Sequence, residues 1–260
     1  MKKHGSKLVL CVALLVGVLG GAVGRAADEQ EAPEFLVVWQ EDVKPEHMET
    51  YMKTRIADAQ LWDQHGFEFP FMTFVQDFRV TTAYRFKAFA QFDGIPMKME
   101  AWNKKTGGKM KQLDKQRMAC LSNSSSAIVM ARPDLSYAPE SPAFTPHADE
   151  PFYSLRIIYH IKPDKVEEAE AMGKKVKAIN EKKQSPMGYL MYQKIFGQDD
   201  VAFIAVINAK DKASFAALDK QMQANPDPEI EKLFSDNAHI LKRIETQEGV
   251  FAPEASYVPE

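Results

Sequence analysis

Two stretches of the chain carry the same pattern of hydrophobic and polar positions. A mainly apolar segment, FLVVWQEDV, fills residues 35–43, and a second, YSLRIIYHI, fills residues 153–161. Each is followed by Lys-Pro and an acidic residue, and Pro163 lies 118 positions after Pro45. The pattern therefore predicts a unit that occurs twice in tandem.

The ends of the two units also match. Residues 133–140 read PDLSYAPE and residues 253–260 read PEASYVPE, with Tyr257 lying 120 positions after Tyr137. Short insertions in loops produce a small drift of this kind. We expect each Ser-Tyr segment to run extended along a sheet edge and to wrap the opposite half of the molecule.

Periodicity within each unit predicts the order β-α-β-β-α-β of a ferredoxin-like fold. The first helix should bury an apolar stripe made of Met48, Tyr51, Met52, Ile56 and Ala59. The expected strands cover 35–43, 67–76, 80–90 and a short last strand at 128–130 in the first unit, and 153–161, 187–195, 200–208 and 249–251 in the second. The second helix is broken in both units, at 106–108 and at 225–228, by Gly and Pro residues.

The N-terminus has the pattern of a secretory signal. Three lysines precede an apolar stretch from Leu8 to Val23, and small residues at 24–26 suit cleavage after Ala26. The expected organisation is a signal peptide at 1–26, a first repeat at 27–140, a linker at 141–152 and a second repeat at 153–260. The mature protein is then periplasmic or secreted, and Cys120 is its only cysteine, so it forms no internal disulfide.

Charge and hydropathy restrict the partners. The net charge is −3 and the lysines are spread along helical faces, which disfavours nucleic acid as a partner. No second apolar stretch reaches membrane length, so we expect no stable membrane insertion after cleavage of the signal. A monomer and a homodimer are both compatible with the sequence.

Duplication and element order together resemble the dimeric α/β-barrel superfamily, which includes antibiotic-biosynthesis-type monooxygenases and NIPSNAP-like proteins. The resemblance implies an α+β fold in which two tandem ferredoxin-like repeats form a pseudo-dimeric α/β barrel. It also implies that a small, partly apolar molecule binds between the two sheets or between a sheet and its helices, with oxidation that needs no cofactor as one activity.

A polar set on the second unit's first strand suggests where such a molecule binds. Arg156 and His160 share one face of this strand, and Arg85 lies on the third strand of the first unit. His160 suits a base and either arginine suits a carboxylate or an oxyanion. The alternative is that His160 is solvated and the arginines pair with Asp42 or Glu41. Aromatic lining is expected from Phe67, Phe69, Phe71, Phe74, Tyr84, Phe86, Tyr189 and Tyr192.

The resemblance offers haem as an alternative cofactor, because chlorite dismutase-like relatives use a helical histidine as axial ligand. His239, in a predicted helix of the second unit, is the candidate. The motifs of nucleophile-elbow hydrolases, zincins, Cys-x-x-Cys proteins and nucleotide-binding loops are absent from the sequence. These residues do not decide between an enzyme, a haem protein and a non-enzymatic binding or interaction module.

Overall fold

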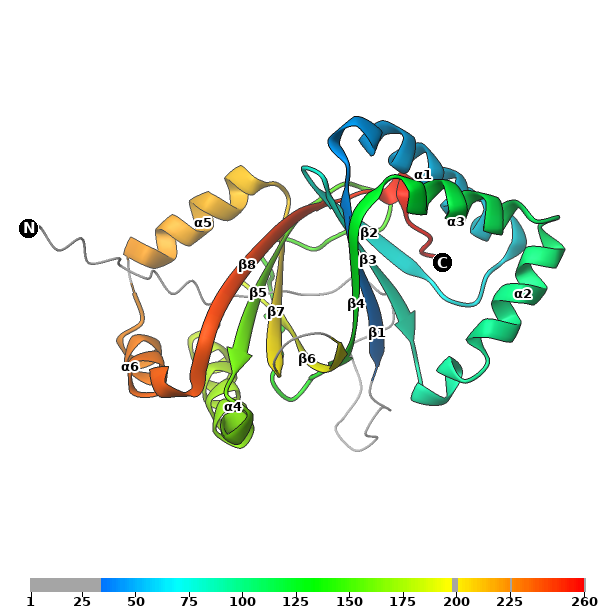
Figure 1. Cartoon of the computed structure of the whole chain (residues 1–260). Helices are drawn as coiled ribbons and strands as arrows, with labels where there is room; N and C mark the ends of the chain where they lie inside the picture. The colour runs from blue at the N-terminus through cyan, green and yellow to red at the C-terminus, as the bar shows by residue number, and fades with distance from the viewer. Residues whose placement is uncertain (1–33, 198–200, 225, 260) are drawn as a thin grey trace, which may run out of the picture.

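The computed structural model describes residues 34–197, 201–224 and 226–259. Within them, the strands close into one antiparallel barrel in the order β1-β3-β2-β8-β5-β7-β6-β4, and the helices pack outside it (Figure 1). The prediction of two ferredoxin-like units in a pseudo-dimeric barrel is confirmed. The expected signal peptide, 1–26, lies outside the described residues.

The two halves have the same order of elements. The first half contains β1 (Phe35–Val43), α1 (Met48–His65), β2 (Phe71–Gln76), β3 (Arg79–Phe86), α2 (Ile95–Lys105), α3 (Lys109–Ala119) and β4 (Leu121–Ala131). The second half contains β5 (Tyr153–Ile161), α4 (Val166–Lys183), β6 (Leu190–Gly197), β7 (Ala202–Ala209), α5 (Lys212–Ala224), α6 (Pro228–Asp236) and β8 (Leu241–Phe251). Seams between β2 and β8 and between β4 and β6 join the halves.

The second helix of each half is interrupted as predicted, and the local structure at the break differs between the halves. Gly108 precedes α3 with φ +83°, a left-handed conformation that glycine adopts without strain. In the second half, the Asp227 side chain accepts hydrogen bonds from the backbone of Glu229 and Ile230 and so caps α6. Each break lets the chain turn over the sheet with two short helices.

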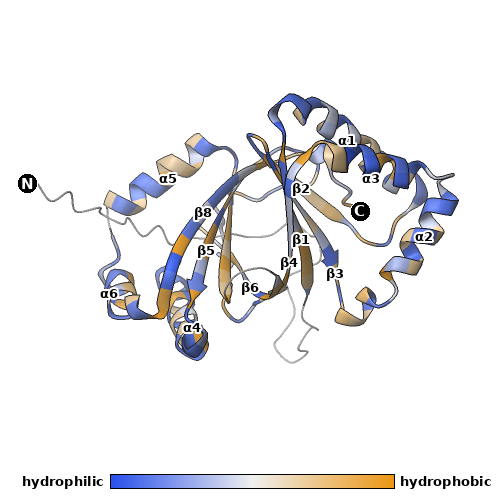
Figure 2. Cartoon of the chain, viewed as in Figure 1, coloured by the Kyte–Doolittle hydropathy of each residue, from blue (hydrophilic) through white to orange (hydrophobic). Residues whose placement is uncertain are grey.

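The last strands of the two halves are longer than predicted. After an initial leucine, β4 continues with the polar residues Ser122–Ser126, and β8 continues with Lys242, Arg243, Ile244 and Glu245, so neither start shows regular apolar alternation. Figure 2 shows β8 as largely hydrophilic. These residues form strands because β1 and β5 supply complete hydrogen-bonding ladders beside them, which sequence periodicity does not reveal.

Successive side chains on each strand point alternately toward the helices outside the barrel and into its lumen. On β5, Leu155, Ile157 and Tyr159 pack in one core cluster with Val176 of α4, so this set points outward to the helices. The intervening residues of β5 therefore point into the barrel lumen. Pairing across the ladders assigns the other strands in the same way.

Two C-terminal straps exchange between the halves. Tyr137, from the end of the first repeat, pairs with Tyr189 of the second half, and Tyr257 pairs with Phe71 of the first half. This reciprocal wrapping is the arrangement that the repeated Ser-Tyr segment predicted. The strap at 133–140 therefore packs on the second half although its sequence belongs to the first repeat.

The buried face of α1 differs from the predicted apolar stripe. Tyr51 and Ala59 are buried as expected, but so are Thr54, Arg55 and Asp58. Charged residues occupy this face because they pair with one another beneath the helix, which a hydrophobic pattern cannot indicate.

Candidate functional site

Three candidate site residues come from the sequence, Arg156, His160 and Arg85. Their side chains all point into the barrel lumen, and each lies beside a different polar or charged group. Arg85 forms an ion pair of 2.7 Å with Glu34. Arg156 donates only a long hydrogen bond, 3.4 Å, to the backbone carbonyl of Glu248. Strand pairing places the side chains of all three residues on the inward face of the barrel.

His160 is buried, so the solvated alternative does not hold for it. Its Nε2 lies 3.4 Å from Oε1 of Glu245. Burial lowers the pKa of His160, and nearby Arg243 lowers it further, while Glu245 opposes both. The imidazole is therefore neutral in the folded protein near neutral pH.

The acids named in the other alternative have different basic partners. Asp42 pairs with Arg79 at 2.7 Å, and Glu41 lies 3.6 Å from Nε of Arg117. Neither acid neutralises Arg156.

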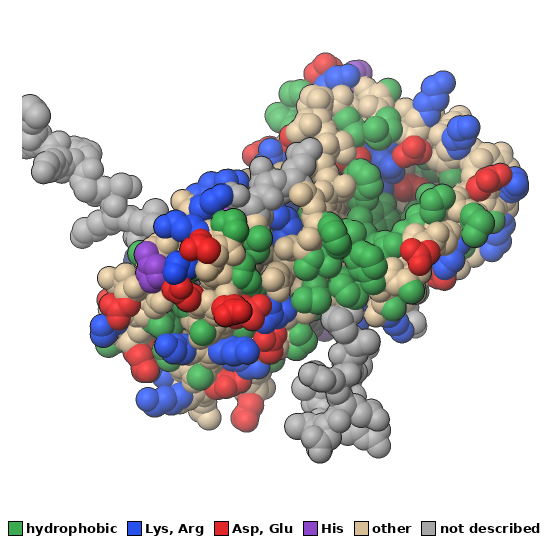
Figure 3. Space-filling model, turned by 60° about the horizontal axis from the view of Figure 1, so that its bottom comes forward, with side chains coloured by type: hydrophobic (Ala, Val, Ile, Leu, Met, Phe, Trp, Pro, Cys, Tyr) green, Lys and Arg blue, Asp and Glu red, His purple; other side chains and the backbone are tan. Residues whose placement is uncertain are grey.

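A second candidate site lies outside the barrel, where the first half's sheet is incompletely covered. Trp39 on β1 is 42% exposed, whereas Ile157, its counterpart 118 positions later on β5, is only 4% exposed. The helices of the second half thus cover their sheet, and those of the first half leave part of theirs open. Figure 3 shows this region as a hollow with hydrophobic walls and charged side chains at its bottom.

We call this hollow the first-half cleft. Its walls come from the sheet, from α2 and from α3, and consist mainly of aromatic and branched aliphatic side chains. The outward face of the sheet carries Val37, Trp39, Tyr84 and Ile128 here, Trp102 of α2 and Leu113 of α3 pack against the same core cluster, and Arg117 of α3 reaches Glu41 on this face. Apolar walls with a few aimed polar groups are typical of small-molecule sites.

Arg55 anchors a buried polar network beneath the cleft. Its guanidinium is fully buried, pairs with Asp58 at 3.2 Å and donates to the hydroxyl of Tyr84 at 3.4 Å. It also donates to Thr82 at 3.1 Å, and Asp58 accepts from the indole of Trp62. Burial raises the pKa of Asp58, although Arg55 and the nearby Arg117 favour its charged form.

Arg117 extends the network to the surface of the cleft. It pairs with Asp114 at 2.5 Å, lies 3.5 Å from Asp58 and 3.6 Å from Glu41, and its side chain is 17% exposed. The hydroxyl of Tyr51 donates to Glu41 at 2.5 Å, and burial raises the pKa of Tyr51. The Nε atom of Arg117 is buried and has no hydrogen-bond acceptor among the described residues. The floor of the cleft therefore presents a partly exposed guanidinium that is already paired with acidic side chains.

Sequence reasoning anticipated Tyr84 in this site but missed Trp39, Arg55, Asp58 and Arg117. One signal was available, since Arg55 and Asp58 are spaced i,i+3 within a helix otherwise marked by apolar residues. Arg117 carried no comparable signal, because α3 is polar over most of its length.

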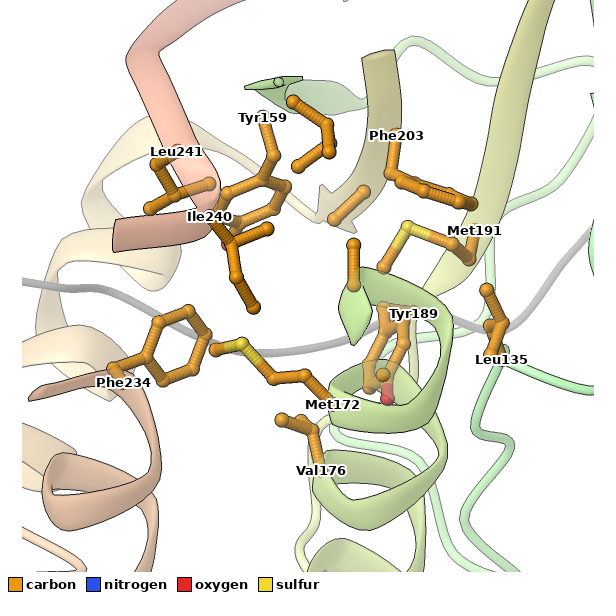
Figure 4. A pocket seen from close by; sticks show the side chains of 14 residues that line it. Leu135, Tyr159, Met172, Val176, Tyr189, Met191, Phe203, Phe234, Ile240 and Leu241 are labelled. Carbon is orange, nitrogen blue, oxygen red and sulfur yellow. The ribbon is translucent and has the colours of Figure 1, made fainter. Parts of the chain in front are cut away.

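The second half has a smaller pocket in the equivalent place, between its sheet and helices α4 and α6. Figure 4 shows Met172 and Val176 of α4 and Phe234 of α6 facing Tyr159 and Ile240 across it. The cavity measures about 70 Å³ and its lining is almost entirely apolar. Tyr189 contributes a buried hydroxyl that has no hydrogen-bond partner among the described residues, and burial raises its pKa.

The residues present do not fit a haem in this pocket. His239 lies in a short 3-10 turn, Ala238–Ile240, where its side chain is 53% exposed and bonds Glu168 at 3.0 Å. No histidine is among the residues that line the pocket, and its volume is far below the roughly 300–1,000 Å³ of typical ligand sites. The described residues also contain no His, Cys, Asp and Glu cluster suited to a metal ion.

Comparison with solved structures shows which fold this is. An anthrone oxidase-like protein superposes with a TM-score of 0.57 at 8% identity, over 85% of this chain and 91% of its own. A candidate monooxygenase from Lactobacillus acidophilus NCFM gives 0.54 at 8% identity, over 88% of this chain and 100% of its own. The protein has the dimeric α/β-barrel fold. A chlorite dismutase from Candidatus Nitrospira defluvii superposes at 0.49 with 12% identity, over 87% and 93% of the two chains.

No family model matches the sequence, and comparison with curated proteins yields no significant match. The superpositions establish the fold of this dimeric α/β barrel. At 8% sequence identity they establish nothing about its chemistry. Within the described residues, none of the helices has both the length and the apolar character needed to cross a bilayer.

Proposed function

We propose that this dimeric α/β barrel binds a small, flat aromatic molecule in the first-half cleft and oxidises it with molecular oxygen without a cofactor. The observation that carries the proposal is that Trp39 is exposed and Tyr84 half-buried on an incompletely covered sheet face, on the side where Arg117 is partly exposed. Aromatic rings stack favourably on such walls, and a cation at the floor favours an anionic substrate. The fold shared with an anthrone oxidase-like protein supports the same class.

The proposed reaction requires the cleft to bind the substrate and to stabilise its enolate. An anthrone-type substrate has a CH₂ group that loses a proton to solvent water and gives a resonance-stabilised enolate. Arg117 lies where its charge stabilises this enolate, and the buried ion pairs hold its guanidinium in place. The enolate is electron-rich enough to react with O₂ directly. The peroxide that the enolate forms with O₂ takes a proton back from water and then loses H₂O to give the ketone. Overall, CH₂ and O₂ give C=O and H₂O, so oxygen supplies the whole oxidising equivalent.

Oxygen uptake with anthrone as substrate tests the proposal. We expect uptake above the spontaneous rate, one O₂ consumed per anthraquinone formed. Trp39→Ala should lower kcat/KM about tenfold or more by removing the stacking wall, and Arg117→Gln should lower kcat by about 100-fold.

Phe78→Ala is the matched control, because Phe78 is 48% exposed but lies in the turn between β2 and β3, outside the residues that line the cleft. Its activity should equal that of the unaltered protein. Equal rates for Trp39→Ala and the unaltered protein, or no uptake above the spontaneous rate, would exclude the cleft as an anthrone-oxidising site.

We further propose that the protein acts outside the cytoplasm. This rests on the N-terminal sequence alone, with its lysines, apolar stretch and small residues before Ala27. Mass spectrometry of the protein isolated from the exported fraction should give an N-terminus at Ala27, and a retained Met1 would contradict it.

A further inference from the structure

The lumen of the barrel is partly open rather than fully packed. Outward-facing residues of β5 and β7 such as Ile157 and Ile207 are buried, whereas inward-facing Ile158 and Ile204 on the same strands retain partial accessibility. In a filled barrel of this size the inward side chains are the most buried ones. Partly accessible inward side chains also include Leu36, Val38, Gln40, Met72, Arg85, Arg156, Tyr192, Val206, Asn208 and Gln247.

The lumen also reaches solvent at one end. Asn123 near the start of β4 pairs with inward-facing Asp42, and Arg243 near the start of β8 pairs with inward-facing His160. Both Asn123 and Arg243 are exposed. This end of the barrel therefore faces solvent, at a place separate from the first-half cleft.

Arg156 is the unusual group in this space. Other lumen arginines have acidic partners, since Arg79 pairs with Asp42 and Arg85 with Glu34. Among the described residues, Arg156 has no carboxylate partner, only the carbonyl at 3.4 Å. Desolvation lowers its pKa to about 10, and the positive charge of Arg79 acts in the same direction.

A guanidinium that lies in this position without a carboxylate partner lowers the stability of the folded protein. Folding removes part of its hydration, and among the described residues only the long hydrogen bond to the Glu248 carbonyl replaces it. An anion that entered the lumen would supply the missing charge and accept the unused N–H donors. The adjacent apolar side chains, Ile158 and Val206, would contact an uncharged body attached to that anion.

We infer that the barrel lumen is a second ligand site, separate from the first-half cleft, that takes a small organic carboxylate with its charged group on Arg156 and its apolar body against the aliphatic lumen wall. Carboxylate and guanidinium match in a two-bond geometry, which an alcohol of the same length cannot reproduce. The aliphatic wall favours an acid with a short hydrocarbon chain over inorganic anions.

Isothermal titration calorimetry of the full mature chain with hexanoate tests the inference, with hexan-1-ol as the neutral probe. We expect one hexanoate site per chain and binding of hexan-1-ol at least about tenfold weaker. Arg156→Met should weaken hexanoate about tenfold or more and leave hexan-1-ol unchanged, whereas Arg156→Lys, which keeps the charge but not the two-bond geometry, should lose less affinity than Arg156→Met.

Two further variants keep the test decisive. Arg156→Gln serves if Arg156→Met fails to fold, as judged by circular dichroism, and should show the same loss. Trp39→Ala alters the cleft and should bind hexanoate normally. No hexanoate binding by the unaltered chain, equal binding by the Arg156 variants, or a loss in Trp39→Ala would overturn the inference.

Discussion

Buried ionisable side chains set the chemical character of the first-half cleft at the scale of single residues. Arg55 and Arg117 form one network with three acids, the buried Asp58 and Glu41 and the exposed Asp114. Paired in this way, they avoid the large penalty for an isolated buried charge. Their arrangement also orients Tyr84, whose hydroxyl accepts from Arg55 at the cleft.

Tyr51→Phe tests how strongly this network is coupled to stability. The change removes the 2.5 Å hydrogen bond to Glu41 and leaves a buried carboxylate short of a donor. We expect the free energy of unfolding to fall by about 1–3 kcal/mol in urea denaturation. Tyr137→Phe is the control, because its hydroxyl bonds only a half-buried backbone carbonyl, so its loss should be smaller. A larger loss for the control would contradict the account.

His160 makes the stability depend on pH. Burial lowers its pKa below the ordinary value of 6.5, so below about pH 6.5 the unfolded chain binds a proton that the folded chain does not. Stability contributed by the neutral imidazole is therefore present above this pH and lost as the pH falls through it. His160→Gln should reduce the drop in melting temperature between pH 7.5 and 5.5.

The exposed His147 supplies the control for this measurement. His147→Gln should leave the drop unchanged. If His160→Gln behaves in the same way as His147→Gln, the neutral state assigned to His160 is wrong.

At the scale of elements, the sequence predicted the strands that have a clear apolar pattern. It missed the strand segments that form only because a neighbouring strand pairs with them. The first strands were predicted as 35–43 and 153–161 and occur at those residues, because their apolar runs are bounded by Lys-Pro. The polar starts of β4 and β8 were missed, since strand pairing rather than side-chain pattern makes them strands. The cleft was missed for a related reason, because only tertiary packing brings Arg117 of α3 to the face of β1 that carries Glu41 and Trp39.

The C-terminal strap is the element whose role can be isolated most cleanly. Ser256 accepts a hydrogen bond from the Thr73 backbone, and Tyr257 is buried and pairs with Phe71. Removing residues 256–260 should destabilise the protein by roughly 3–5 kcal/mol, which a thermal or urea denaturation curve measures. Removing only 258–260 keeps these contacts and should have little effect. Equal melting temperatures for the two truncations would contradict a structural role for the strap.

At the scale of the whole molecule, closure of the barrel makes each half depend on the other. Without its partner, either half would expose the strand edges that now form the β2–β8 and β4–β6 seams, and it would lose the strap that covers it. Unequal covering of the two sheets then gives this near-symmetric molecule an open cleft in the first half (Figure 3) and a small apolar pocket in the second.

Expression of residues 34–140 alone tests this dependence. We expect a self-associated species in which two copies complete a barrel, or aggregation, because a lone four-stranded sheet leaves both edges unpaired. Size-exclusion chromatography with light scattering distinguishes these states. A monomer that unfolds cooperatively would show that the half is an independent domain.

Tryptophan fluorescence tests the central claim, that the first-half cleft binds a flat aromatic molecule, most directly. Trp39, Trp62 and Trp102 are the only tryptophans of the chain, and all three belong to the first half, where Trp39 and Trp102 line the cleft. Titration with anthraquinone should quench the emission in a saturable one-to-one manner, and Trp39→Ala should shift the midpoint to about tenfold higher concentration. Emission that stays unchanged up to the solubility limit, or a midpoint unaffected by Trp39→Ala, would contradict the claim.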